Sequence, residues 1–483
     1  MANSIVWFRR DLRLKDNPAL SAAVKNSDQV IPVFIHSPEE EKNWRPGEAS
    51  DWWLHHSLLS LDQSLRKKGS SLLLKQGASL EVLTNLSKEF GVEQVYWNRL
   101  YDPEVVKRDK EIKQALIESG IKTESFNGYL LTEPWEIKNG SGECYKVYTP
   151  FSKNIFKTFS CPERFSEPKK ILSFENIIVS RDKFETDLAA LELLPSIDWD
   201  KEFYDHWSPG EQVARKVLSK FSSKADRNYS DNRDIPSIDG TSLLSPHLHF
   251  GEISPQEIWR SVSDSEISSS EKHAYLRQLI WRDFAFSLLF NFPKSSDKPL
   301  RSEYSKFPWK KNKKQLAAWQ KGQTGYPLVD AGMRQLWRTG WMHNRVRMVA
   351  GSLLVKHLLQ PWQEGAKWFW ETLVDADLAN NSMGWQWVAG SGADAAPYFR
   401  VFNPVRQGER FDADGEYIKK WVPELKDLPK KWIHCPWDAP ELVLEEAGVK
   451  LGKNYPFPLV EPSEGRSRAL EAYDNFKDLT AND

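Results

Sequence analysis

The sequence has few cysteines and lacks the long apolar runs of membrane proteins. Only three of its 483 residues are cysteine, and Cys144, Cys161 and Cys435 lie far apart. An odd, scattered set does not form a disulfide framework and indicates a reducing compartment. It also cannot supply the four thiolates of an ordinary iron–sulfur cluster. No apolar run approaches the roughly 18 residues that a membrane-spanning helix needs, and the first residues lack the apolar stretch of a secretion signal.

Other absences narrow the functional class. The net charge is −1, so bulk charge does not predict a binder of polyanions, although a local basic face is still compatible with one. The glycine-rich sequence GxGxxG of dinucleotide-binding folds is missing. His247 and His249 have no third ligand nearby, so we predict no metal site. We expect a cytoplasmic protein that uses no membrane.

Tryptophan is abundant, with 22 residues. A buried indole N–H needs a partner, so this number suggests either stacking and electron transfer or simply large cores, and the count alone favours neither. The segment 341–387 combines six indoles with polar residues inside an apolar helical pattern, namely Asn344, Arg347, Asp375, Asp377 and Asn381. Each polar group buried without a partner costs roughly 1–3 kcal/mol. The segment therefore predicts a pocket for a large polar ligand, and an aromatic redox cofactor fits.

The length predicts two or three domains. Residues 1–130 alternate short apolar strands, expected at 4–8, 29–36, 71–75, 95–97 and 121–126, with amphipathic helices expected at 51–69, 79–90 and 103–119. Ser50 is the expected N-cap of the first helix. This alternation predicts an α/β domain with a doubly wound parallel sheet and helices on both faces.

The rest of the chain differs from this first domain. Residues 131–208 are rich in glycine and proline or only weakly periodic, so we predict an interdomain connection there. Residues 209–483 have almost no strand signals. Helical patterns occur at 211–221, 255–263, 271–290, 329–359 and 361–374. We therefore predict a second, all-α domain.

Two of these helices carry a repeated set of side chains. Each presents an indole, an amide and a guanidinium at i, i+3, i+6 and i+7, which is one helix face: Tyr275, Gln278, Trp281 and Arg282 on one, and Trp341, Asn344, Arg347 and Met348 on the other. These faces either line a ligand or are polar edges of amphipathic helices, and their large aromatics favour a ligand. Residues 240–245 offer hydroxyls and N–H groups ahead of a helix, where phosphate binds, although serine and threonine there are usually only caps.

Several longer motifs carry a resemblance to a known family: VWFRRDLRLKDNPAL, DGTSLLSPHLHFGEISP, LIWRDF, TGYPLVDAGMRQLWRTGWMHNRVRM, DADLANN, GWQW and PYFRVFNPVRQGERFDADGEYIKKWVPEL. With these the chain resembles the photolyase/cryptochrome flavoproteins over nearly its whole length. The resemblance implies an antenna domain at residues 1–130 and a helical FAD- and DNA-binding domain at 209–483. It is strongest to microbial cyclobutane pyrimidine dimer photolyases, because Asn344 follows His343 where (6-4) photolyases have a second histidine.

The resemblance also implies which residues bind FAD. They are Tyr229, Thr241, Ser242, Leu243, Leu244, Ser245, Trp281, Arg282, Asn344, Arg347, Asp375, Ala376 and Asp377. Asn381 would face the ring nitrogen that gains a proton on reduction. Trp385, Trp362 and Trp309 match the family's relay of three indoles between the flavin and the surface, although packing is the alternative role for each indole. A folate or a deazaflavin could be a second, antenna chromophore, with Glu104 and Asp109 as candidate contacts.

The implied partner is damaged DNA, bound by a monomer that works on the bacterial nucleoid. The implied lesion and DNA contacts are Arg233, Gln278, Trp281, Asn344, Arg345, Met348, Trp387 and Gln407. Trp281 and Trp387 would stack on a dimer flipped out of the duplex. Gln278 departs from the family, because dimer photolyases usually have glutamate there. The implied reaction is light-dependent repair by an electron from reduced FAD, and a cryptochrome photoreceptor or a (6-4) photolyase stays open as an alternative.

Overall fold

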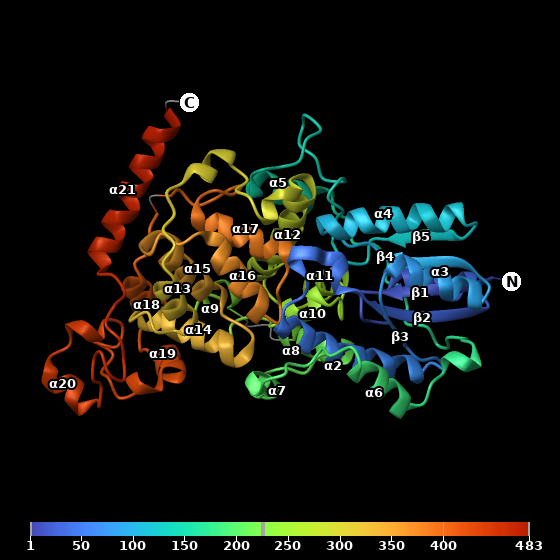
Figure 1. The fold of residues 1–483 in the computed structure, drawn as a ribbon, viewed down its shortest axis with the longest axis horizontal. Coiled ribbons are helices and arrows are strands. Elements are labelled where there is room, and N and C mark those ends of the chain that lie inside the picture. The colour runs from blue at the N-terminus through green and yellow to red at the C-terminus, as the bar shows by residue number, and fades with distance from the viewer. Residues whose placement is uncertain (1, 224–227, 399, 482–483) are drawn as a thin grey trace.

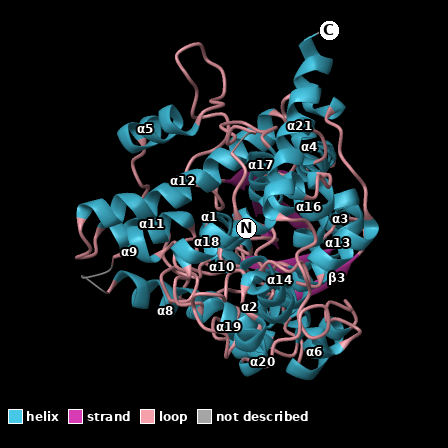
Figure 2. Cartoon of the chain, turned by 90° about the vertical axis from the view of Figure 1, so that its left-hand side faces the viewer, coloured by secondary structure: helices cyan, strands magenta, loops and turns pink. Residues whose placement is uncertain are grey.

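The computed structural model describes residues 2–223, 228–398 and 400–481. Its first part is built around a sheet, which lies on the right of Figure 1, and its second part is an assembly of helices on the left. Viewed from the helical end, the strands lie behind the helices (Figure 2). The predicted order of an α/β part followed by a helical part is therefore confirmed.

The sheet has five parallel strands in the order β3-β2-β1-β4-β5. They are β1 (Asn3–Phe8), β2 (Gln29–His36), β3 (Leu73–Gln76), β4 (Val92–Asn98) and β5 (Lys122–Phe126). Central β1 has Ile5 opposite Ile31 of β2 and Val95 of β4. Because the chain order reverses direction on either side of β1, the carboxyl ends of β1 and β4 form the edge at which doubly wound sheets bind ligands.

Side-chain alternation along β1 explains why helices cover both faces. Ile5 and Trp7 point to the core that contains Leu83 and Ile112, which belong to α3 (Ser79–Glu89) and α4 (Pro103–Glu118). Val6 and Phe8 point to the opposite core, formed with α1 (Pro18–Asn26) and α2 (Glu48–Arg66). Successive strand residues face opposite sides, so a fully apolar strand needs cover on each.

Two details of this domain differ from expectation. Helix α1 was not predicted, although Asn17 accepts a hydrogen bond from the Leu20 N–H as an N-cap and Pro18 opens the helix. Helix α2 begins at Glu48 with Gly47 as its N-cap, so the prediction of Ser50 as the cap is wrong. Gly47 lies there because a Cβ at this position would come within 2.6 Å of the Trp370 carbonyl oxygen.

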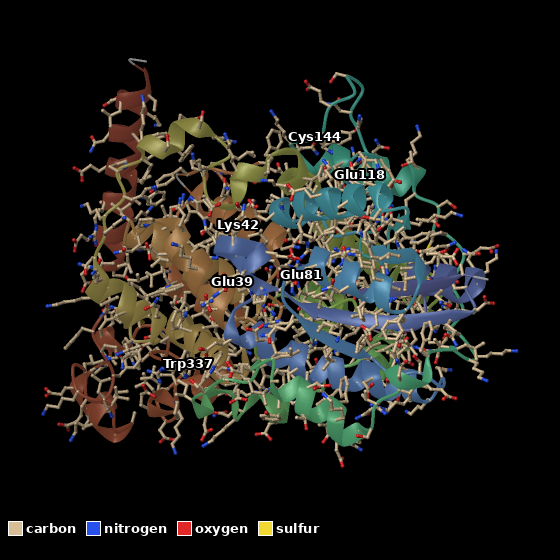
Figure 3. The ribbon with its side chains drawn as sticks, turned by 45° about the vertical axis from the view of Figure 1, so that its right-hand side comes forward. Glu39, Lys42, Glu81, Glu118, Cys144 and Trp337 are labelled. Carbon is tan, nitrogen blue, oxygen red and sulfur yellow. The ribbon has the colours of Figure 1, made fainter. Side chains whose placement is uncertain are left out.

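The segment 131–208, predicted as a connection, contains helices of its own. These are α5 (Tyr148–Thr158), α6 (Arg181–Ala189) and α7 (Phe203–His206). Helix α5 packs on the second domain beside α12 (Ser269–Asn291), as Figures 1 and 2 both show. Cys144 lies in the loop that projects ahead of α5 (Figure 3), and all three cysteines are free. The segment is thus structured: α5 packs on the helical assembly, whereas α6 packs on the sheet domain beside β3.

The helical part follows. Its helices are α8 (Glu211–Ser222), α9 (Tyr229–Asn232), α10 (Ser245–His249), α11 (Pro255–Ser263), α12, α13 (Lys313–Gln320), α14 (Pro327–Thr339), α15 (Asn344–Ser352), α16 (Trp362–Thr372), α17 (Leu378–Ala389), α18 (Pro404–Phe411), α19 (Glu416–Trp421), α20 (Glu441–Glu446) and α21 (Pro462–Ala481). A π-helical turn, Leu353–His357, continues α15. Over the described ranges, none of these helices has the length and apolarity to span a bilayer.

The single helix predicted over 329–359 is wrong, because the chain breaks between α14 and α15. Gly340 ends α14 in the left-handed conformation, with φ at 65°, which favours glycine. His343 then caps α15 by accepting a hydrogen bond from the Arg345 N–H. Trp341 therefore lies in the loop and not on the helix face with Asn344, although the Arg347 guanidinium still lies 6.0 Å from its ring.

The short helical segment η1 (Pro38–Trp44) of the sheet domain lies at the boundary between the two parts of the molecule. Figure 3 shows Glu39 and Lys42 of this segment between the sheet domain and the helices of the second domain. Lys42 forms an ion pair with Glu104 of α4, and the Trp44 indole lies edge-on to Trp370 of α16 at 5.4 Å. The segment thus contacts both parts.

Candidate functional site

A partly buried ion pair joins two segments of the helical domain. The Arg347 guanidinium on α15 donates from Nη2 to both carboxylate oxygens of Asp375, at 2.9 and 3.0 Å. The Asp375 side chain is only 5% exposed, and it also accepts a hydrogen bond of 2.7 Å from the Ser245 hydroxyl. Three residues implied for FAD therefore meet, although more than 100 positions separate Ser245 from the other two.

Asp377, two residues further along, has a different environment. Its carboxylate caps α17 by accepting from the Asn380 N–H at 2.9 Å and lies 3.7 Å from Nδ1 of His249. Burial alone would raise its pKa, but the neighbouring His249 imidazole and the charge of Arg282 lower that pKa to about 2. Burial lowers the pKa of His249. Asp377 is therefore held as a carboxylate next to the segment 240–250.

The loop before α10 has an unusual backbone at Leu243. Its φ is 54°, a value that non-glycine residues rarely adopt and that clusters at ligand-binding sites. The Ser242 hydroxyl accepts a hydrogen bond of 3.0 Å from the Tyr275 hydroxyl, and the Tyr275 ring lies edge-on to Tyr229 at 5.2 Å. The structure thus brings Tyr229 and Ser242, two residues implied for FAD, against Tyr275 of α12.

The residues around this loop fit a large polar ligand such as FAD. Arg282 is buried and donates from Nη1 to the Tyr129 carbonyl at 2.6 Å, whereas its Nη2 has no hydrogen-bond partner among the described residues. A buried guanidinium group without a full set of partners is costly. On α17, a Cβ added to Gly384 would meet nothing within 4 Å, so the helix surface is open there. Asn381 on the same helix donates to the Ala366 carbonyl at 2.9 Å.

A second part of the site is a polar cavity of about 340 Å³ beside α12. It is lined by Ser230, Arg233, Asp234, Ala274, Arg277, Gln278, Trp281 and Arg345. Four of these, Arg233, Gln278, Trp281 and Arg345, were implied as lesion or DNA contacts. Ala274 precedes Gln278 by one helical turn, so extending the predicted face by a turn would have included it. Asp234 and Arg277 give no such signal.

Charge and hydrogen bonding hold the walls of this cavity. Arg345 donates from Nη2 to the Asp234 carboxylate at 2.7 Å and lies over the Phe411 ring at 4.4 Å. Gln278 donates from Nε2 to the Ala274 carbonyl one turn earlier, at 3.0 Å. The amide oxygen of Gln278 takes no part in this hydrogen bond. The cavity is lined by three arginines and one aspartate. This excess of positive charge suits a negatively charged phosphate backbone at the rim of the cavity.

Other implied DNA contacts are not among the described residues that line this cavity: Asn344, Met348, Trp387 and Gln407. Asn344 is exposed at the start of α15 and its amide lies 4.0 Å from the Met348 sulfur one turn later. Gln407 lies on α18, the helix whose last residue is Phe411. Trp387 is half-buried on α17.

The three indoles of the implied relay differ in depth. Trp385 and Trp362 are buried, and Trp309 is half-buried. Trp385 packs so closely on α16 that a Cβ at Gly365 would lie 2.1 Å from its ring. Its ring contacts include Phe369 at 5.0 Å and Trp319 at 6.0 Å. Sequence reasoning missed Trp319, which has no motif around it.

Not every indole belongs to a relay. Trp337 lies in the lower left part of the view in Figure 3 and is 41% exposed. Its ring stacks on Trp368 at 5.9 Å and lies 4.9 Å from Trp199. Trp7 and Trp97 contact each other within the sheet domain. Much of the tryptophan content therefore serves packing between elements.

A further small cavity, about 80 Å³, lies at the carboxyl edge of β1 and β2. Its walls include Trp7, Arg9, Arg10, Arg108 and Trp370 together with His249 and Ala376. Glu104 and Asp109 are not among the described residues that line it: Glu104 pairs with Lys42, and Asp109 pairs with Arg9. Ala376 lies between Asp375 and Asp377, so this cavity adjoins the implied FAD loop.

Family models match both parts of the chain. Residues 4–169 match a model described as DNA photolyase, and residues 275–475 match the FAD binding domain of DNA photolyase. Together the two matches cover the sheet domain and most of the helices that build the ion pair and the polar cavity.

Individual proteins are similar over nearly the whole chain. A deoxyribodipyrimidine photo-lyase of Agrobacterium fabrum is 47% identical, covering 99% of this chain and 98% of the relative. Cryptochrome-1 of Arabidopsis thaliana is 40% identical, covering 99% of this chain and 71% of the relative. The crystal structure of a bacterial class III photolyase from Agrobacterium tumefaciens superposes with a TM-score of 0.94 at 46% identity, covering 99% and 98% of the two chains.

Proposed function

Because the chain belongs to the photolyase/cryptochrome family of FAD-binding proteins, we propose that it repairs cyclobutane pyrimidine dimers in DNA with light. It is a DNA photolyase with FAD as its cofactor. The observation that carries the proposal is the polar cavity of Trp281, Gln278 and three arginines, which shares helix α15 with the Arg347–Asp375 pair through Arg345. This arrangement puts a stacking surface and phosphate-binding groups beside the cofactor residues.

In this proposal Ser245, Arg282, Arg347 and Asp375 hold FAD. Arg282 contributes the Nη2 group that has no partner among the described residues, and Arg347 and Asp375 hold each other in a fixed orientation. Once bound and reduced, FAD would supply on excitation by light the electron that splits the dimer ring and would receive it back from the separated bases, so the cofactor would carry the difficult step and the protein would position it. Trp385, Trp362 and Trp309 carry electrons from the surface inward.

The DNA would be held at the rim of the cavity. Arg233 and Arg345 attract phosphates, which supplies affinity but little sequence information. The Trp281 indole offers an apolar surface to a flipped-out dimer, and Gln278 offers an amide oxygen and one N–H to its base edges. We propose the residue boundary 130/131 for the antenna domain and residues 209–483 for the part that binds FAD and DNA.

A second function is favoured by one residue and one relative. Gln278 occupies the position at which dimer photolyases usually have glutamate, and a plant protein named Cryptochrome-1 is 40% identical. Both are compatible with a photoreceptor that binds FAD and does not repair. A (6-4) photolyase shares the glutamine, but Asn344 follows His343 where that class has a second histidine.

The test measures light-dependent loss of each lesion from defined oligonucleotides. We expect the flavin-loaded, reduced protein to remove thymine dimers and to leave (6-4) lesions. Removal of neither lesion would support the photoreceptor, and removal of the (6-4) lesion alone would support that enzyme.

Gln278→Glu provides a sharper comparison in the same assay. A hydrogen bond involving a charged group contributes roughly 1.5–3 kcal/mol against about 1 for a neutral one, so repair should change by roughly two- to thirtyfold. An ionised glutamate cannot replace the donor that now bonds the Ala274 carbonyl, whereas a neutral one can. Gln323→Glu, the same change on an exposed residue of α13's following loop, serves as the control and should leave repair unchanged. A change greater than a hundredfold would contradict the modest role assigned to this amide.

We further propose that a second, antenna chromophore binds at the edge of β1 and β2, with the small cavity there taking only a part of it. Arg9, Arg10 and Arg108 line the cavity together with the indoles Trp7 and Trp370, and such a mixture suits a flat anionic ring system. The test is to incubate the purified protein with a folate or with a deazaflavin, remove the unbound compound and record the near-ultraviolet absorbance. A spectrum that shows only the flavin in both cases would contradict this proposal.

A further inference from the structure

Trp281 presents its two faces to different surroundings. One face stacks on the Tyr148 ring of α5, with the ring centres 3.5 Å apart and the planes inclined by 4°. Trp281 also lines the polar cavity, whereas Tyr148 is not among the described residues that line it. Tyr148 is only 1% exposed. The tyrosine therefore lies behind the indole, and the cavity lies on its other side.

Tyr148 is fixed to the same turn of helix that carries the indole. Its hydroxyl donates a hydrogen bond of 2.9 Å to the Arg277 carbonyl, which belongs to the residue one turn before Trp281. The Arg277 guanidinium also lies 5.6 Å from the Tyr148 ring centre, and Arg277 lines the cavity. The Tyr148 ring thus contacts both Arg277 and Trp281, two residues that line the cavity.

Two further contacts complete the support. The Phe284 ring lies edge-on to both partners of the stack, at 5.7 Å from Trp281 and 5.8 Å from Tyr148. The Tyr148 N–H donates to the Asp394 carboxylate at 3.3 Å. Asp394 follows α17 and has a φ of 47°, so the start of α5 is tied to the loop after the helix that carries Trp387.

We propose that Tyr148 is a positioning residue that holds Trp281 flat for stacking on the lesion. This role rests on the proposed function, because it concerns the indole that would meet the flipped-out dimer. An indole on a helix has rotatable χ1 and χ2 angles, and a parallel ring behind it fixes both. A preorganised stacking surface loses less conformational freedom when the ligand binds. The segment that we predicted to be only a connection would thereby set lesion preference.

The measured quantity is the ratio of affinities for dimer-containing and undamaged DNA of the same sequence. An aromatic pair contributes enough beyond its buried area to alter an equilibrium constant by about two- to tenfold. We expect Tyr148→Leu and Tyr148→Met to lower the ratio by this factor, with undamaged-DNA affinity and flavin content as in the parent. Tyr148→Phe keeps the ring and should restore at least half of the loss.

A matched control separates stacking from packing of α5. Phe151 lies one turn further along α5 and contacts Phe284 at 5.2 Å, and its ring contacts do not include Trp281 within the described ranges. Phe151→Leu should keep the parent ratio. In a Trp281→Ala background, Tyr148→Leu should cause no further loss, because the residue through which it acts is gone.

The outcomes separate this role from the function itself. If the parent shows no preference for the dimer, the proposed function fails and the role of Tyr148 fails with it. If the parent prefers the dimer and both Tyr148→Leu and Tyr148→Met keep that preference while binding flavin, only the positioning role is overturned. It is also overturned if Phe151→Leu lowers the ratio equally, or if Tyr148→Leu and Trp281→Ala have additive effects.

Discussion

Removing the Arg347 guanidinium tests whether the buried ion pair organises the cofactor site. In Arg347→Ala, the Asp375 carboxylate would keep its hydrogen bond from Ser245 and lose both contacts from Nη2. Breaking a buried pair from one side costs roughly 3–5 kcal/mol. We expect the lower end, about 3 kcal/mol, because the Arg347 side chain is 24% exposed and water can partly replace it.

Urea unfolding of the flavin-free proteins measures this loss, and absorbance of the purified proteins measures bound FAD. The loss corresponds to roughly a hundredfold change in the folding equilibrium constant, because 1.4 kcal/mol is a factor of ten. We also expect Arg347→Ala to retain little flavin. In the same background, Asp375→Asn removes the unpaired charge and should recover at least half of the lost stability.

Arg338→Ala is a matched control from the neighbouring helix. Arg338 forms a close ion pair with Glu202, at 2.6 Å, but both side chains are at least 40% exposed. Such surface pairs contribute about 0.2–1 kcal/mol, so this variant should unfold almost like the parent and keep its FAD. If Arg347→Ala unfolds at the parent's urea concentration and carries a full complement of flavin, the reasoning about this pair is refuted.

Four other substitutions test the relay, the lesion contacts and the response to acid. Trp385→Phe should keep its flavin but block photoreduction by an external reductant, while the chemically reduced variant still repairs; photoreduction at the parent rate would exclude this relay. Trp387→Ala should lower the preference for damaged DNA by the ~1–3 kcal/mol of a stacked base, and an equal loss of affinity for damaged and undamaged DNA would assign that indole to packing. Arg345→Ala should instead weaken binding to both DNAs and reduce the salt dependence of binding. Burial lowers the pKa of His343 to about 4, so below a pH of about 6.5 the unfolded chain binds a proton that the folded chain excludes, and stability should fall by up to roughly 1.4 kcal/mol per pH unit down to about pH 4. His343→Asn keeps an N-cap without the titration, so an unchanged slope in urea titrations at several pH values would contradict this.

The sheet domain was predictable because its signals are local. Each strand of a parallel sheet is covered on both faces and therefore is a short apolar run, as in β2, which was predicted with its observed bounds of Gln29–His36. Helix α11 was also predicted over its observed range. Ser254 caps it through the Glu257 N–H, and Pro255 opens it. Cap and first-turn residues are read directly from neighbouring positions.

The break between α14 and α15 was not predicted, because apolar periodicity continues across it. The glycine that ends α14 is also required by distant residues, since a Cβ at Gly340 would lie 2.6 Å from Val374 and 2.9 Å from Phe203. Helix α1 was missed for a different reason: it is as long as α11, but its apolar and polar residues are less clearly separated onto two faces. Sequence patterns thus locate elements but not the tertiary contacts that end them.

The candidate site shows the same division between local and distant information. The Arg347–Asp375 pair joins residues 28 positions apart, and the motifs that carry the family resemblance contain both. The support behind Trp281 has no such motif: it joins Tyr148, Trp281 and Asp394, which lie in three separate segments. Only folding places them together, because α5 packs across α12 and its first residue reaches the loop after α17. A segment with weak periodicity can therefore contribute to a site as much as the helices that carry the family motifs. Its contribution is a fixed surface against which a functional side chain is held.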